Sequence, residues 1–156
     1  FLLLAALPAP GRAESRVKVG ALFPRSGYAA DGGRDELNGA TLAVEQVNTT
    51  GGIRTRVLEL VVEDTRSDTG TTVEAFEKLV SGDRVVAVVG PTWPEFTEAV
   101  VPSAGSSGVP VIVPSGYRTS PQNGEPWVFT LWPAPAGVVE PLVRLIRSRG
   151  HRTLAV

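Results

Sequence analysis

A run of five apolar residues, Val85 to Val89, ends abruptly at Gly90-Pro91. A strand with one wet face alternates apolar and polar residues, whereas an unbroken apolar run is typical of a strand covered on both faces. The chain has no cysteine, so no disulfide can take the place of a packed core. The run therefore predicts a sheet with helices on both sides.

The rest of the chain alternates short apolar runs with longer stretches of helical period. Leu37, Ala40, Val44 and Val47 recur at three- and four-residue spacing, which indicates one buried face of a helix. The predicted strands are 17–23, 57–63, 85–89, 111–113 and 127–131, and further helices are expected at 71–80, 93–104, with Pro102 bending or splitting it, and 137–150. This order predicts an α/β fold, a parallel sheet flanked by helices.

Turn and cap residues mark the predicted helix starts. Asp64 and Asp68 stand where side-chain oxygens accept backbone N–H groups, and 71–74 has the form of a capping box. A second box, Thr92 to Glu95, begins the helix after the apolar run. Either Glu95 satisfies the free N–H groups there, or they remain open to a ligand carboxylate.

Catalytic and nucleotide-binding patterns are missing from the sequence. It contains no G-x-S-x-G, G-x-x-x-x-G-K-[ST] or G-x-G-x-x-G, and its single histidine, His151, lies in a polar turn. The arginines are scattered along a chain of net charge −1, which gives no indication of nucleic-acid binding. We expect no enzyme activity, no metal and no cofactor.

A small-ligand site is expected where the loops follow the carboxyl ends of the strands. Hydroxyls, backbone N–H groups and an aromatic ring in these loops suit a small polar molecule. The tryptophan beside Pro94 is either a packed corner or a wall of that site. The candidate contacts are Ser26, Tyr28, Thr92, Trp93, Ser115 and Tyr117.

Seven phrases in order resemble one family. They are 17–24 with Ser26-Gly27, 38–48, 51–53, 61–64 with Ser67-Asp68, 86–91, 108–115 and 128–130. Together they resemble type 1 periplasmic binding proteins of ABC transporters, in the branch that binds leucine, isoleucine, valine and related amides.

The resemblance implies two α/β lobes that close on a ligand. Residues 16–132 would form lobe one and 133–156 the incomplete start of lobe two. It also implies a protein without enzyme activity that captures an amino acid, amide or related carboxylate and presents it to a membrane permease. The alternative on the same fold is a ligand-binding sensor or receptor domain.

Two site positions depart from the family pattern. Trp93 and Pro94 stand where amino-acid binders supply a serine hydroxyl, while Ser115 and Tyr117 match the next contributing loop, with Tyr117 where threonine is common. An aromatic residue expected before the first helix falls near Gly32, and Tyr28 lies close enough in sequence to replace it.

The first 13 residues resemble the end of a secretory signal peptide. Phe1 to Leu7 is apolar but shorter than a membrane span, and small residues follow at Gly11 and Ala13. The alternative is a ragged hydrophobic terminus. With no cysteine to be lipidated, we expect a soluble periplasmic or secreted product, and a sequence that is a fragment at both ends.

Overall fold

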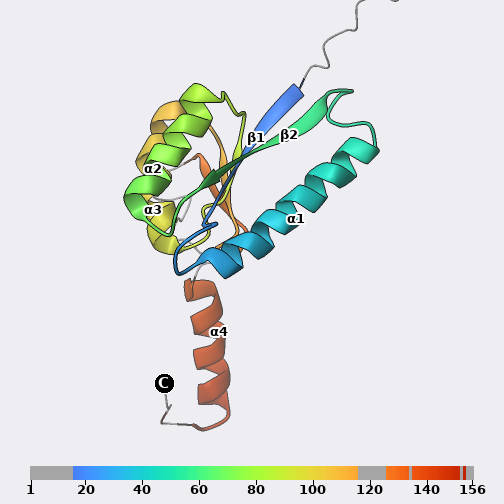
Figure 1. Ribbon diagram of the computed structural model, residues 1–156. Helices are drawn as coiled ribbons and strands as arrows, with labels where there is room; N and C mark the ends of the chain where they lie inside the picture. The colour runs from blue at the N-terminus through green and yellow to red at the C-terminus, as the bar shows by residue number, and fades with distance from the viewer. Residues whose placement is uncertain (1–15, 116–125, 134, 152, 154–156) are drawn as a thin grey trace, which may run out of the picture.

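The computed structural model describes residues 16–115, 126–133, 135–151 and 153, which form a five-stranded parallel sheet with helices on both faces (Figure 1). The strand order is β2-β1-β3-β4-β5, and every neighbouring pair is parallel. The strands are β1 (Arg16–Phe23), β2 (Val57–Asp64), β3 (Val88–Val89), β4 (Val111–Val113) and β5 (Val128–Thr130). The predicted fold class is confirmed.

The chain reverses its direction of travel across the sheet at β1. From β1 it moves outward to β2, and it then returns to the other side of β1 to build β3, β4 and β5. Helix α1 (Ala30–Thr49) covers one face, while α2 (Thr69–Glu77) and α3 (Pro94–Ser107) pack together on the other (Figure 1). The loops after β1 and β3 therefore diverge to opposite faces and leave a crevice between them.

The strand β3 is shorter than the apolar run that predicts it. Val85 and Val88 are buried, but the side chain of Val86 is 58% exposed. The segment still pairs with β1, since the Val86 N–H donates to the Lys18 carbonyl at 2.9 Å. Val86 borders a hollow at the amino end of the sheet, so the expectation that this whole run is covered on both faces is wrong at Val86.

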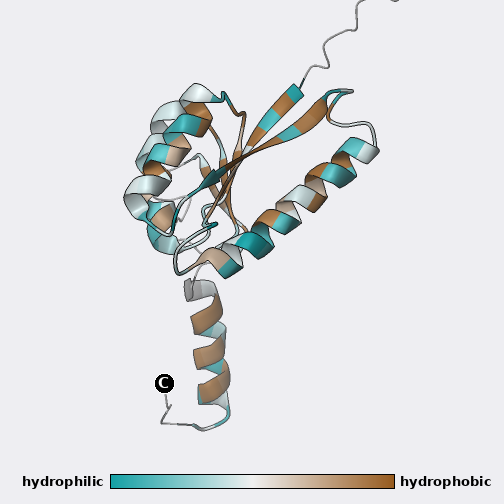
Figure 2. Ribbon diagram, in the orientation of Figure 1, coloured by the Kyte–Doolittle hydropathy of each residue, from teal (hydrophilic) through white to brown (hydrophobic). Residues whose placement is uncertain are grey.

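The core lies between the sheet and the α2/α3 layer. Phe76 of α2 and Val100 of α3 are buried against Leu22 of β1 and Val111 of β4. A π-helical turn, η1 (Lys78–Gly82), continues α2 and inserts Leu79 next to Gly20. Figure 2 shows apolar residues along the strands and on the helices, including α4.

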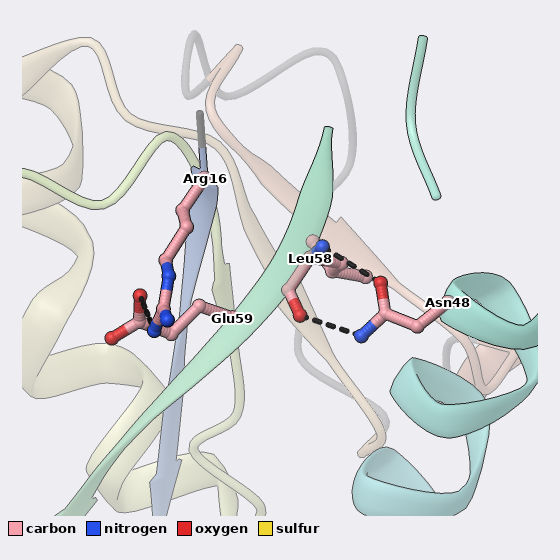
Figure 3. Close-up of polar contacts among 4 residues, drawn as sticks. All are labelled: Arg16, Asn48, Leu58 and Glu59. Atoms are coloured by element: carbon pink, nitrogen blue, oxygen red, sulfur yellow. Dashed lines mark hydrogen bonds and ion pairs between the residues drawn. The ribbon is translucent and has the colours of Figure 1, made fainter. Parts of the chain in front are cut away.

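On the opposite face, α1 lies with the predicted stripe of Leu37, Ala40, Val44 and Val47 half-buried. Its carboxyl end is held to the sheet by Asn48, as Figure 3 shows. The Asn48 Nδ2 donates to the Leu58 carbonyl, and Asn48 Oδ1 accepts from the Leu58 N–H, both at 2.8 Å. One amide thereby satisfies both backbone groups of a residue on the edge strand β2.

The helix starts differ in part from the predicted ones. Asp68 caps α2 by accepting the Thr71 N–H at 2.7 Å, as expected for this residue. The capping box at 71–74 is wrong because the helix already begins at Thr69. Pro102 lies inside α3 without dividing it, and Gly108 ends the helix with a left-handed φ of 65°.

The last helix, α4 (Pro135–Ser148), projects away from the sheet (Figure 1). Its apolar side chains are largely exposed, among them Val138, Leu142 and Leu145. Of the helices in the described ranges, none is both long and apolar enough to cross a membrane.

Candidate ligand-binding site

A hollow of about 340 Å³ opens at the carboxyl edge of the sheet, beside the crevice where the chain reverses direction. Residues from α1, from the loops after β3 and β4 and from the end of β5 converge on it. This is the place where open α/β sheets bind small ligands. Its lining consists of Glu36, Thr92, Trp93, Pro94, Pro114, Ser115 and Trp132.

Gly90 turns the chain out of the sheet into this hollow. Its φ is 95°, and a Cβ added there would fall 2.1 Å from the carbonyl oxygen of Leu22. Only glycine allows so close an approach of two backbones. The following Gly90-Pro91 peptide bond is cis, and the chain then reaches Thr92 and Trp93 at the wall of the hollow.

Thr92 does not cap α3, in contrast to the predicted capping box. The N-cap residue is Trp93, which makes no side-chain hydrogen bond to the helix. The Thr92 hydroxyl donates instead to Glu36 on α1, and Glu95 accepts a hydrogen bond from the Tyr28 hydroxyl at 3.0 Å. Both side chains of the supposed box are engaged elsewhere, so the start of α3 has no side-chain cap.

Glu36 brings a half-buried carboxylate to the hollow. Burial raises the pKa of Glu36 above its usual value; the hydrogen bond from Thr92 lowers it in part, and the nearby charge of Asp35 raises it. Desolvation disfavours the charged form of this carboxylate, so a cationic partner nearby would stabilise that form.

Trp93 both packs against its neighbours and lines the hollow. Its indole lies over the first turn of α1, where a Cβ added to Gly32 would be 3.0 Å from Cη2. Its other neighbour is Phe96, edge-on at a centroid distance of 6.4 Å. Trp93 therefore fills the space over Gly32, near which the family resemblance implies an aromatic residue. Tyr28, the nearby replacement that the sequence offers, lies outside the hollow and is 73% exposed.

Ser115 presents a buried hydroxyl oxygen to the same hollow. No partner for Ser115 Oγ exists among the residues that the structure describes. A buried hydroxyl without a partner costs free energy, which a ligand that hydrogen-bonds to it would recover. Tyr117, predicted beside it, lies outside the described residues.

Ser26 is not brought into this hollow. Its hydroxyl donates to Asp64 at the end of β2, 2.8 Å away, and the same carboxylate accepts the N–H groups of Arg25 (2.7 Å) and Arg66 (2.8 Å). Burial raises the pKa of Asp64, but these hydrogen bonds together lower it below its usual value. Asp64 has the structural role that its position predicts, since it joins the ends of two neighbouring strands.

Sequence reasoning missed Glu36 and Trp132. Trp132 could have been found, because it directly follows the predicted strand 127–131 at the same edge of the sheet. No sequence signal distinguishes Glu36, because it is one of several charged residues on an amphipathic helix. No three potential metal-ligating side chains gather anywhere in ranges 16–115, 126–133, 135–151 and 153.

A parallel sheet with a polar and aromatic hollow at its switch point is the arrangement in which open α/β sheets bind small ligands. The sequence profile of the family described as periplasmic binding protein matches residues 16–156. The chain belongs to the periplasmic binding protein family. The resemblance drawn from its seven phrases is confirmed.

Two curated relatives match this chain in sequence. The leucine-, isoleucine-, valine-, threonine- and alanine-binding protein of Pseudomonas aeruginosa is 32% identical over 110 residues, which is 70% of this chain and 29% of that protein. The chemotactic signal transduction system substrate-binding protein BasB of Halobacterium salinarum is 31% identical over 101 residues, 64% of this chain and 24% of that protein.

Among solved structures, the branched-chain amino acid transporter substrate-binding protein LivJ of Streptococcus pneumoniae, in complex with isoleucine, is 37% identical. The superposition has a TM-score of 0.70 and covers 74% of this chain and 33% of that one. The chain spans less than a third of the length of the curated relatives that it matches.

Proposed function

We propose that this chain is part of an extracytoplasmic solute-binding protein of an ABC transporter, which captures an amino acid, amide or related small carboxylate. The observation that carries the proposal is Ser115 Oγ, which has no partner among the described residues and faces a hollow at the switch point of the sheet. The protein holds its ligand without making or breaking a bond, and it presents the ligand to a membrane permease.

The chemistry of the hollow fits a zwitterionic ligand with an apolar side chain. The carboxylate of Glu36 would accept a ligand ammonium group, because burial disfavours this charge without a partner. The hydroxyl of Ser115 and the uncapped start of α3 would bind the ligand carboxylate. Trp93 and Trp132 would pack against the side chain.

Residues 16–132 would form lobe one, and 133–156 would begin a second lobe that closes over the hollow. Two observations support this division. Trp132, which lines the hollow, is exposed, and so are the apolar side chains of α4, such as Leu142 and Leu145. Both surfaces become buried if the rest of the second lobe packs on α4 and closes on the site.

A sensor role is the second candidate function. It is favoured by the similarity to BasB, whose name places it in a chemotactic signal transduction system. The lobe and its hollow serve either role, because ligand capture comes before transport and signalling alike. The partner distinguishes them: pull-down of the permease subunits supports transport, and pull-down of a transmembrane signal transducer supports the sensor.

The test is a thermal-shift and calorimetric screen of the full-length gene product. The panel contains leucine, isoleucine, valine, phenylalanine, their amides and benzoate. A true ligand should raise the melting temperature in proportion to the logarithm of its excess over Kd. The ligand should be recovered chemically unchanged, and a product formed on incubation would contradict a binding role.

The variant Ser115→Ala tests the site itself. It should weaken the best ligand of the panel about tenfold or more, because it removes one hydrogen bond to a charged group. Ser106→Ala, on the exposed side of α3, is the matched control and should bind as the unmodified protein does. If no member of the panel binds, or if Ser115→Ala binds it equally well, the proposal is wrong.

A further inference from the structure

A second hollow, of about 720 Å³, lies at the amino end of the sheet, opposite to the edge that carries the candidate ligand site. Its lining contains one carboxylate, Asp83, and five cationic side chains. The chain as a whole has a net charge of −1, so this positive charge is local. The cations are Arg16, Lys18, Arg54, Arg56 and Arg84.

Three separate segments bring these cations together. Arg16 and Lys18 are at the start of β1. Arg54 lies in a two-residue turn closed by hydrogen bonds in both directions between Ile53 and Arg56, with left-handed φ angles at 54 and 55. Arg84 follows η1, also with a left-handed φ. The arginines that appear scattered in the sequence therefore include a group that meets in the fold.

Most of these charges have no counter-ion in the described part of the chain. Arg16 pairs with Glu59 at 3.3 Å (Figure 3). Among residues 16–115, 126–133, 135–151 and 153, Lys18, Arg54, Arg56 and Arg84 form no ion pair, and Asp83 pairs with none of them. Like charges held in one hollow repel each other, and an anion between them relieves that repulsion.

We infer that this hollow binds a small multivalent oxyanion of the phosphate or sulfate type. The guanidinium group presents several N–H donors in a planar fork, which matches the oxygen atoms of phosphate. The surface is concave and formed by three segments, so it can surround a small anion on several sides. The site is independent of the proposed solute site, from which the sheet separates it.

The experiment measures phosphate binding to the full chain by isothermal calorimetry and thermal unfolding at low ionic strength. Sodium phosphate is compared with sodium chloride at matched ionic strength. We expect a saturable rise in melting temperature with phosphate that exceeds the effect of chloride, and that weakens as salt is added. Chloride raising the melting temperature as much as phosphate does would overturn the inference.

Three triple variants locate the site. R54Q/R56Q/R84Q should bind phosphate at least about tenfold more weakly, while R34Q/R144Q/R147Q, which removes the same charge from α1 and α4, should bind it normally. R54K/R56K/R84K keeps the positive charge but lacks the planar guanidinium groups, so it should bind phosphate with intermediate affinity. This result would show that the loss in the glutamine variant is not caused by misfolding. Equal loss in both glutamine variants would mean a general charge effect and would sink the idea.

Two further measurements complete the test. The first measurement is cosedimentation with phosphatidylglycerol vesicles. If the protein binds these vesicles but shows no phosphate binding by calorimetry, the hollow recognises a membrane surface and not a small anion, and the inference is overturned. The R54Q/R56Q/R84Q variant should still bind the best solute of the panel described above. Failure of the phosphate site is thereby distinguished from failure of the proposed solute-binding function.

Discussion

The indole of Trp93, which lines the candidate site, packs over the backbone of Gly32, so that a Cβ at Gly32 would meet Cη2 of Trp93 at 3.0 Å. The variant Gly32→Ala should therefore displace the indole by a few tenths of an ångström toward the hollow. We expect the best solute ligand to bind about three- to tenfold more weakly, as measured by calorimetry.

The same helix offers a matched control for that substitution. No atom lies within 4 Å of a Cβ added to Gly39. Gly39→Ala should stabilise the fold by up to about 1 kcal/mol, through helix propensity alone, and leave the ligand affinity unchanged. If both variants bind alike, the position of Trp93 does not matter for the site.

Glu36 should make stability fall as the pH rises. Its pKa in the folded protein is raised, so between its usual pKa and this raised value the folded state holds more protons than the unfolded state. The free energy of unfolding should therefore decrease as the pH rises from the usual glutamate pKa through the raised one. Urea unfolding at a series of pH values measures this slope, and Glu36→Gln should remove it.

The hydrogen bond from Thr92 to Glu36 gives the same prediction a second test. Thr92→Val deletes the one contact that lowers the pKa of Glu36, so this pKa should rise further and the loss of stability should extend to higher pH. Carboxyl NMR of Glu36 follows the titration directly. An unchanged titration midpoint in Thr92→Val would show that the two side chains do not interact in solution.

The fold could be predicted from the sequence because its determinants are local. The spacing of Leu37, Ala40, Val44 and Val47 defines one face of α1 whatever surrounds it. The failures concern contacts across the chain. Threonine is a common N-cap residue, but the Thr92 hydroxyl donates to Glu36, 56 positions away in the sequence. The periodicity of apolar residues does not predict such a pair.

The same reasoning explains the mixed outcome at the candidate site. Strand ends can be predicted, so Thr92, Trp93 and Ser115 were placed together correctly at one edge. Which hydroxyl at that edge remains unpartnered depends on tertiary packing: Ser26 is held by Asp64, whereas Ser115 is not bonded within the described residues. Their roles in ligand binding stay predictions.

Asp64 should account for part of the stability that is lost in acid. Its pKa is lowered in the folded protein, so its contribution is complete above the usual aspartate pKa and disappears as the pH falls through the lowered value. Asp64→Asn should cost about 1–2 kcal/mol at neutral pH and flatten the decline below about pH 4, as measured by urea unfolding.

Glu98→Gln, on the exposed side of α3, removes one negative charge without a comparable network and serves as the control. It should change the free energy of unfolding by no more than about 0.5 kcal/mol. If the free energy of unfolding of Asp64→Asn falls as steeply in acid as that of the unmodified protein, the loop contacts of Asp64 to Arg25 and Arg66 do not contribute to stability.

Asn48 should contribute to stability by closing the edge of the sheet. Its amide satisfies both the N–H and the carbonyl of Leu58 at 2.8 Å, in a partly buried position (Figure 3). Asn48→Ala leaves both backbone groups without this partner and should lower the free energy of unfolding by about 1–3 kcal/mol in urea titrations. Asn38→Ala makes the same substitution on the exposed side of the same helix and should have little effect on the free energy of unfolding. If both variants lower this free energy equally, the loss comes from helix α1 itself and not from its junction with β2.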